Sequence, residues 1–111
     1  MENTPKKGQY RWLVFKKGEE WIAAALEFNI VEVGDDPKKV LYELEQSVRG
    51  YIEATSEIKD FRPQLVNQIL NQSPEEEYEK LWYQLMERSQ KREPVPSYVF
   101  DFGTRNLAVN A

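Results

Sequence analysis

The tetrapeptide Gly34-Asp35-Asp36-Pro37 separates a strand-rich beginning of this 111-residue chain from a helical middle, and it constrains the fold more than any other feature. The Asp36 carboxylate can accept hydrogen bonds from the free N–H groups of a first helical turn. Proline is favoured at the first helical position, because an N–H there would have no helical partner. The sequence therefore predicts a helix that begins at Pro37.

Three strands are predicted before this boundary. Tyr10 to Phe15 and Ile30 to Val33 are rich in β-branched and aromatic residues. Trp21 to Phe28 is nearly all apolar, which a helix could share, but Gly18 in the preceding turn favours a hairpin. Because the links between these segments are short, the strands can form only an antiparallel meander.

Helical periodicity predicts three helices after the boundary. The first ends near Thr55, and the second begins at Pro63. The third follows a capping box, in which Ser73 caps the helix, Pro74 starts it and Glu76 bonds back to the cap. The apolar positions at helical spacing are Val40, Leu41, Leu44, Val48, Tyr51 and Ile52 in the first helix, Leu65, Val66, Ile69 and Leu70 in the second, and Tyr78, Leu81, Trp82, Leu85 and Met86 in the third.

A last strand, Tyr98 to Phe102, is predicted after a stiff spacer bounded by prolines. The chain is therefore expected to form one α+β domain over residues 10–111, preceded by a flexible leader over residues 1–9. A helical insertion over about residues 57–92 precedes the last strand, and Ile58 and Phe61 are interpreted as anchors in its first loop.

The composition excludes several classes of catalyst. The chain has no cysteine and no histidine, so it lacks disulfides, thiolate nucleophiles, Cys/His zinc sites and imidazole acid–base catalysis. It also has no Gly-rich phosphate loop. The acidic pairs lie in a turn or at predicted helix starts, where capping and the helix dipole explain them, and Asp101 is interpreted as facing outward from the last strand. We therefore expect no enzymatic activity, no cofactor and no metal site.

Charge and hydropathy limit the classes of partner. Fifteen basic and nineteen acidic residues give a net charge of −4, and no basic cluster forms a phosphate track, so nucleic acid is not an expected partner. No apolar run approaches the roughly 20 residues of a membrane helix, and the start has no signal-peptide pattern. We expect a cytoplasmic protein that does not bind membranes.

The aromatic residues admit three interpretations. Most of them are expected to fill the core. Trp12, Trp21, Tyr98 and Phe100 could also form a stacking platform for single-stranded nucleic acid, although a basic groove is missing. The third interpretation is a protein-binding surface, since exposed aromatic side chains are typical of interfaces. The candidate partner-binding residues are Tyr98, Phe100, Phe102 and Trp82.

The first half of the chain has the shape of a known family. A strand ends in Phe15-Lys16-Lys17-Gly18, a return strand runs from Trp21 to Glu27, and the turn at Gly34-Asp35-Asp36 leads into a helix that ends in Tyr51-Ile52-Glu53. This arrangement resembles the HicB-like antitoxin domain, a partial ribonuclease-H-like fold. The resemblance implies a sheet in the order 3-2-1-4, a last strand parallel to the first, and helices packed on one face.

The resemblance also implies a role. HicB-like proteins commonly neutralise a small ribonuclease toxin, and many carry an additional DNA-binding domain. This chain has Glu27-Phe28-Asn29-Ile30 in place of the family's Pro-Asp-Leu-Pro-Gly-like turn, and it shows no basic recognition helix. The expected function is therefore a non-enzymatic, antitoxin-like module that binds a protein partner, and a small toxin is a candidate for that partner. The protein is also expected to form a homodimer, and exchange of the last strand between two copies is one route to it. The alternative is a nucleic-acid-binding transcriptional regulator of a toxin–antitoxin type system.

Overall fold

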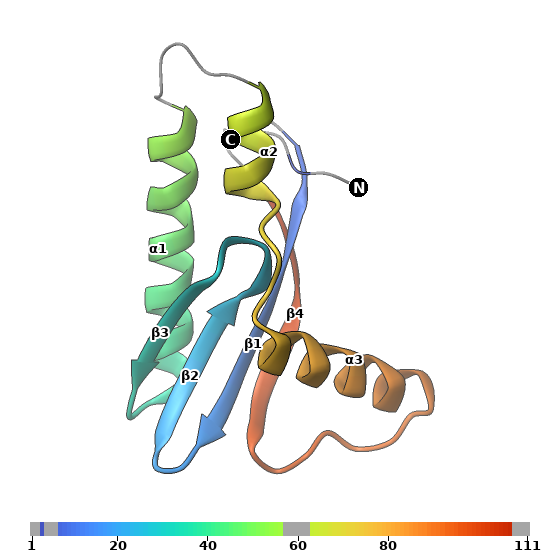
Figure 1. Ribbon diagram of the computed structural model, residues 1–111. Coiled ribbons are helices and arrows are strands. Elements are labelled where there is room, and N and C mark those ends of the chain that lie inside the picture. The colour runs from blue at the N-terminus through green and yellow to red at the C-terminus, as the bar shows by residue number, and fades with distance from the viewer. Residues whose placement is uncertain (1–2, 4–6, 57–62, 108–111) are drawn as a thin grey trace.

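The computed structural model describes residues 3, 7–56 and 63–107, which form a sheet flanked by helices (Figure 1). Its elements are β1 (Gln9–Lys17), β2 (Glu20–Ala25), the 3-10 helix η1 (Leu26–Phe28), β3 (Ile30–Gly34), α1 (Pro37–Ser56), α2 (Pro63–Leu70), α3 (Glu76–Gln90) and β4 (Val99–Asn106). Within these ranges, no helix is long and apolar enough to cross a membrane. The predicted loop anchors Ile58 and Phe61 lie outside the described residues.

The four strands form one sheet in the order β3-β2-β1-β4, which confirms the predicted α+β class and strand order. The predicted meander is present. Its second strand ends at Ala25 and not at Phe28 as predicted, because Leu26–Phe28 form the 3-10 helix η1. The direction predicted for β4 was wrong, because β4 pairs with β1 antiparallel. The chain leaves α3 and enters the sheet beside the end of β1, where the Lys16 N–H donates to the Tyr98 carbonyl at 2.7 Å. A strand that starts there can only run back along β1.

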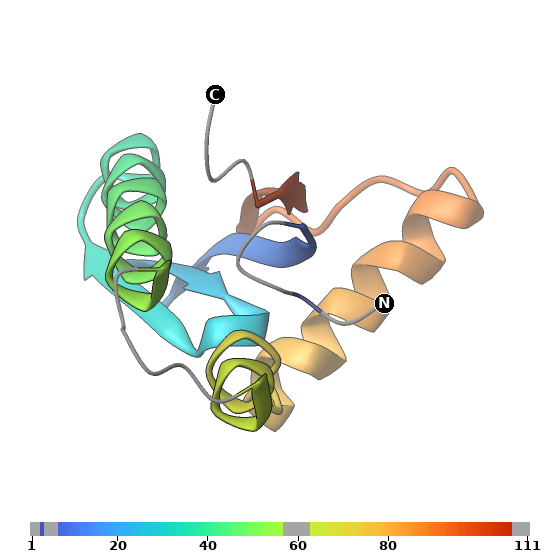
Figure 2. The same cartoon turned by 90° about the horizontal axis from the view of Figure 1, so that it is seen from above.

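The helices do not all pack on one face, which corrects a second expectation. Figure 2 shows α1 on one side of the sheet and α3 on the other. The first core joins α1 and the end of α2 to Tyr10, Trp12 and Val14 of β1, whereas the second joins α3 to Leu13 and Phe15. Side chains alternate along a strand, so β1 supplies apolar residues to both faces.

The first helix begins as predicted. The Lys38 N–H donates to the Asp36 carboxylate at 2.9 Å, so Asp36 caps α1. The residues of its predicted stripe pack against the sheet: Val40, Leu44, Val48 and Ile52 are buried, and Leu41 and Tyr51 pack beside them. In α2, Leu70 is buried, but Leu65 is 43% exposed.

The predicted capping box was wrong. Helix α3 begins at Glu76, and no side chain caps its first turn. The preceding residues are held by η1 instead: the Gln72 N–H donates to the Glu27 carbonyl at 2.9 Å, and the Asn29 amide donates to the Ser73 carbonyl at 3.0 Å. These long-range bonds keep the segment extended past Ser73 and delay the helix.

A second set of polar contacts holds Asn3 in place. Asn3 is buried, its amide donates to the Leu70 carbonyl at 3.0 Å, and its side-chain oxygen accepts the Gln9 N–H at 2.7 Å. Asn71 exchanges two hydrogen bonds with the Asn3 backbone, at 2.7 and 3.0 Å. Asn3 therefore ties the start of β1 to the end of α2.

Candidate functional site

Three aromatic side chains, Trp21, Tyr98 and Phe100, lie at the corner of the sheet where β1 ends and β4 begins, and we call them the aromatic corner. Tyr98 lies on the α3 side of the sheet, whereas Phe100 packs on Trp21 on the α1 side. Tyr98 and Phe100 are 43% and 39% exposed, which is high for rings of this size. Phe100 meets Trp21 edge to face with ring centroids 6.2 Å apart, and the Lys16 ammonium lies 6.0 Å from the centre of the Trp21 ring.

A register shift explains why Phe100 points away from the second core. Between Val14 and Phe15 the pairing of β1 with β4 jumps, so that Val14 lies opposite Asp101 and Phe15 lies opposite Val99. Phe100 is the extra residue in this bulge. A bulge turns the local side chains relative to a regular strand, which brings Phe100 against Trp21 on the α1 side.

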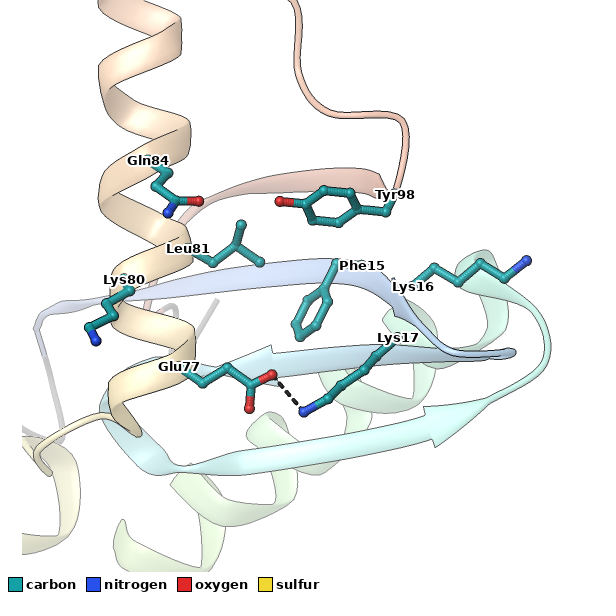
Figure 3. A pocket seen from close by; sticks show the side chains of 8 residues that line it. All are labelled: Phe15, Lys16, Lys17, Glu77, Lys80, Leu81, Gln84 and Tyr98. Carbon is teal, nitrogen blue, oxygen red and sulfur yellow. Dashed lines mark hydrogen bonds and ion pairs between the residues drawn. The ribbon is translucent and has the colours of Figure 1, made fainter.

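A pocket of about 340 Å³ adjoins the corner, between α3 and the start of β4. Figure 3 shows the Tyr98 ring extending over it towards Leu81 and Gln84 of α3, with Phe15 beneath. The remaining lining residues are Lys16, Lys17, Glu77 and Lys80. The pocket thus has an apolar floor, one phenol and a charged rim.

The rim charges are partly paired. The Lys17 ammonium donates to the Glu77 carboxylate at 2.7 Å, and this hydrogen bond raises the pKa of Lys17. The Lys80 ammonium lies 2.9 Å from the Glu76 carboxylate, one turn away on α3. Burial raises the pKa of Tyr78, whose ring packs on Phe15 at 5.8 Å. Lys17 therefore stays charged and Tyr78 stays neutral at neutral pH.

The four predicted partner-binding residues fall into two pairs. Tyr98 and Phe100 belong to the aromatic corner. Trp82 is only 7% exposed, and it meets the partly buried Phe102 edge to face at 6.0 Å in the second core. This second pair holds β4 against α3, so its rings are turned away from solvent.

An ion pair that sequence reasoning missed joins β1 to η1 and lies against α3. Glu27 accepts the backbone N–H of Arg11 at 2.6 Å and two guanidinium donors at 2.9 and 2.6 Å. The guanidinium carbon also lies 5.8 Å from the centre of the Trp82 ring. Neither residue stands in a motif, and their separation of 16 positions gives no local signal. Only the adjacency of β1 and η1 brings them together.

The acidic residues form no metal-binding cluster among the residues that the structure describes. In this part of the chain no group of three or more Asp or Glu side chains could hold a metal ion. Asp101 is exposed, as predicted, and its carboxylate accepts the N–H of Phe102 at 2.9 Å. The aromatic corner and its pocket are therefore the strongest candidate for a functional site.

Comparison with known proteins adds no assignment. No protein-family model, no curated protein and no solved structure matches the chain. The candidate site must therefore be judged from its own chemistry.

Proposed function

We propose that the protein is a non-enzymatic interaction module that binds a protein partner through the aromatic corner. The observation that carries this proposal is the exposure of Tyr98, which lines a pocket with an apolar floor, and of Phe100, two residues further along the chain. Exposed aromatic residues next to a pocket are typical of binding hot spots, because a partner's side chain can bury them and fill the pocket together.

The pocket suggests the chemistry of the bound segment. Its floor of Phe15 and Leu81 suits one apolar side chain, and a volume of about 340 Å³ is large enough for an aromatic ring. Lys17 and Lys80 at the rim already hold Glu77 and Glu76, so Lys16 is the rim cation that would favour an acidic residue beside that anchor. We therefore expect the partner to present an apolar side chain with a carboxylate next to it.

The antitoxin-like role remains part of this proposal, with a small toxin as one candidate partner and with the protein in the cytoplasm as a homodimer. The meander and α1 fit the arrangement that suggested a HicB-like domain. The antiparallel β4 departs from it. The proposal therefore depends on the aromatic corner rather than on the family resemblance.

A site-specific crosslinking experiment tests the proposal. A photoreactive phenylalanine analogue is placed at Tyr98 and, as a control, at Tyr42, which is 62% exposed on α1. Irradiation in cells of the source organism should link a protein to position 98 and not to position 42. Replacing Phe100 with Ser should reduce this adduct at least about tenfold, since a hot-spot ring contributes about 2 kcal/mol or more.

Two results would contradict the proposal. Position 98 could give no protein adduct above the level of position 42, or its adducts could consist of RNA or DNA. The second result would favour the alternative of a nucleic-acid-binding regulator.

A further inference from the structure

The outer side of β4 is an open sheet edge. β4 is the last strand in the order β3-β2-β1-β4, so its second side has no strand beside it among the described residues. Edge strands present unpaired N–H and C=O groups that can pair with another strand. Figures 1 and 2 both show α3 continuing past β4 on this side of the molecule. A strand that joins β4 would therefore also lie close to α3.

The hydrogen-bond pattern defines which groups of β4 point outward. The Leu107 N–H donates to the Gly8 carbonyl at 2.9 Å, so the backbone groups of Leu107 point towards β1. In an antiparallel pair the backbone groups of successive residues point alternately to the two sides of a strand. The backbone N–H and C=O groups of Arg105, Gly103 and Asp101 therefore also point towards β1. The backbone groups of Phe102, Thr104 and Asn106 then face outward. Consistent with this, the Phe102 N–H is bound by the Asp101 carboxylate rather than by β1.

The charges of β4 are complementary to a second copy of the same strand. Asp101 and Arg105 lie two residues before and two residues after Gly103, and all three share the face that carries Trp12. When two copies of β4 run antiparallel with Gly103 opposite Gly103, each Asp101 lies opposite Arg105 of the other copy. Opposite charges directly across an antiparallel pair stabilise it, and like charges destabilise it.

This register also satisfies the outward backbone groups. It places Phe102 opposite Thr104 of the second copy, and both residues have outward N–H and C=O groups. A shift by two residues in either direction would preserve the hydrogen-bond pattern but would leave Asp101 without Arg105 opposite it. Gly103 at the centre has no side chain, so nothing on that face keeps the two strands apart.

We propose that two copies of the chain pair through β4 in this register and form one continuous eight-stranded sheet. This interface would form the homodimer that the proposed function includes, so the inference rests on the homodimer part of that proposal. Arg105 already has a carboxylate partner in its own chain, because its guanidinium lies 2.5 Å from Glu45. In the dimer, Arg105 lies between Glu45 of its own chain and Asp101 of the second copy. The Phe102 N–H, which donates to Asp101 in the single chain, donates instead to the Thr104 carbonyl of the second copy.

A charge-swap experiment tests the interface. Light scattering should give about 26 kDa for the wild type, twice the 13.1 kDa of one chain. Asp101→Arg or Arg105→Asp alone places like charges opposite each other and should raise the dissociation constant at least about tenfold. The double variant Asp101→Arg/Arg105→Asp restores opposite charges and should dimerise again. Asp35→Arg makes the same charge change in the turn before α1 and should not alter the dimer.

A backbone variant tests the hydrogen bonds independently of the charges. Thr104→Pro removes one outward N–H, and proline is tolerated on an edge strand when its N–H would face solvent. This variant should keep its circular dichroism spectrum and become monomeric. A wild type that is monomeric at every concentration would overturn the interface, as would a dimer that persists in both Asp101→Arg and Thr104→Pro.

The outcomes separate this interface from the partner-binding proposal. A monomeric wild type that still gives a protein adduct at Tyr98 would overturn the β4 interface alone. A dimer that follows the charge swap but gives no adduct at Tyr98 would overturn partner binding at the aromatic corner alone.

Discussion

Removing the Glu27 carboxylate should destabilise the protein strongly, because one carboxylate satisfies three donors of Arg11. The side chains of Arg11 and Glu27 are 23% and 17% exposed, so water can replace only part of what is lost. Breaking a fully buried ion pair costs about 3–5 kcal/mol. Allowing for this partial solvent access, we expect Glu27→Ala to lower the free energy of unfolding by about 2–3 kcal/mol.

Urea unfolding followed by tryptophan fluorescence measures this change, since Trp82 lies under the Arg11 guanidinium. Lys80→Ala, which breaks a pair whose side chains are 71% and 82% exposed, is the control and should cost less than about 0.5 kcal/mol. Arg11→Met removes the unpaired cation, so the double variant should lose at least about 1 kcal/mol less than the sum of the single variants. If Glu27→Ala costs no more than Lys80→Ala, the ion pair does not stabilise the fold as its burial and its three donors imply.

Three further predictions concern the helix caps, the close contact at Gly103 and the expected absence of catalysis. Asp36→Ala removes the cap of α1 and should lower the free energy of unfolding by about 1 kcal/mol. Ser73→Ala removes a side chain that does not cap α3 and should change the free energy of unfolding by less than about 0.5 kcal/mol. Equal costs of the two variants would contradict the assignment of the caps. Gly103→Val should lower the free energy of unfolding by about 1–3 kcal/mol in the same urea assay, because a Cβ at position 103 would lie 3.2 Å from the Trp12 ring. An unchanged urea midpoint would show that the Trp12 ring can move aside. The purified protein should show no metal-dependent cleavage of RNA, and cleavage that disappears in Asp101→Asn or Asp35→Asn would overturn the non-enzymatic proposal.

The sequence predicted the elements that depend on local chemistry. The turn at Gly34, the cap at Asp36 and the stripe of α1 involve residues within a few positions of one another, so their spacing carries the information. The capping box failed because Asn29 and Glu27, more than 40 positions away, hold the segment before α3 in an extended form. Nothing in the local pattern at Ser73 reveals these partners.

The two-sided burial of β1 did have a signal in the sequence. Trp12, Leu13, Val14 and Phe15 are four consecutive apolar residues, and all of them are buried. A strand with only one buried face alternates between apolar and polar residues, so an unbroken apolar run indicates that both faces are covered. This pattern could have predicted α3 on the face opposite α1.

The candidate site was only half predictable. Tyr98, Phe100 and Phe102 occupy alternate positions, and a regular strand would place all three on one face. The bulge opposite Phe15 separates them, so that Phe100 packs on Trp21 whereas Phe102 packs on Trp82. A bulge depends on the pairing with β1, which the sequence of β4 alone does not encode.

The pairing of β1 with β4 has a consequence for synthesis of the protein. Tyr10 pairs with Arg105, so β1 leaves the ribosome long before β4 can cover its second edge. Contacts so distant in sequence slow folding, because a long loop must close first. During this interval the apolar run of β1 has an open edge, which makes the nascent chain prone to aggregation. The nascent chain should therefore depend on chaperones most strongly until β4 has emerged from the ribosome and paired with β1.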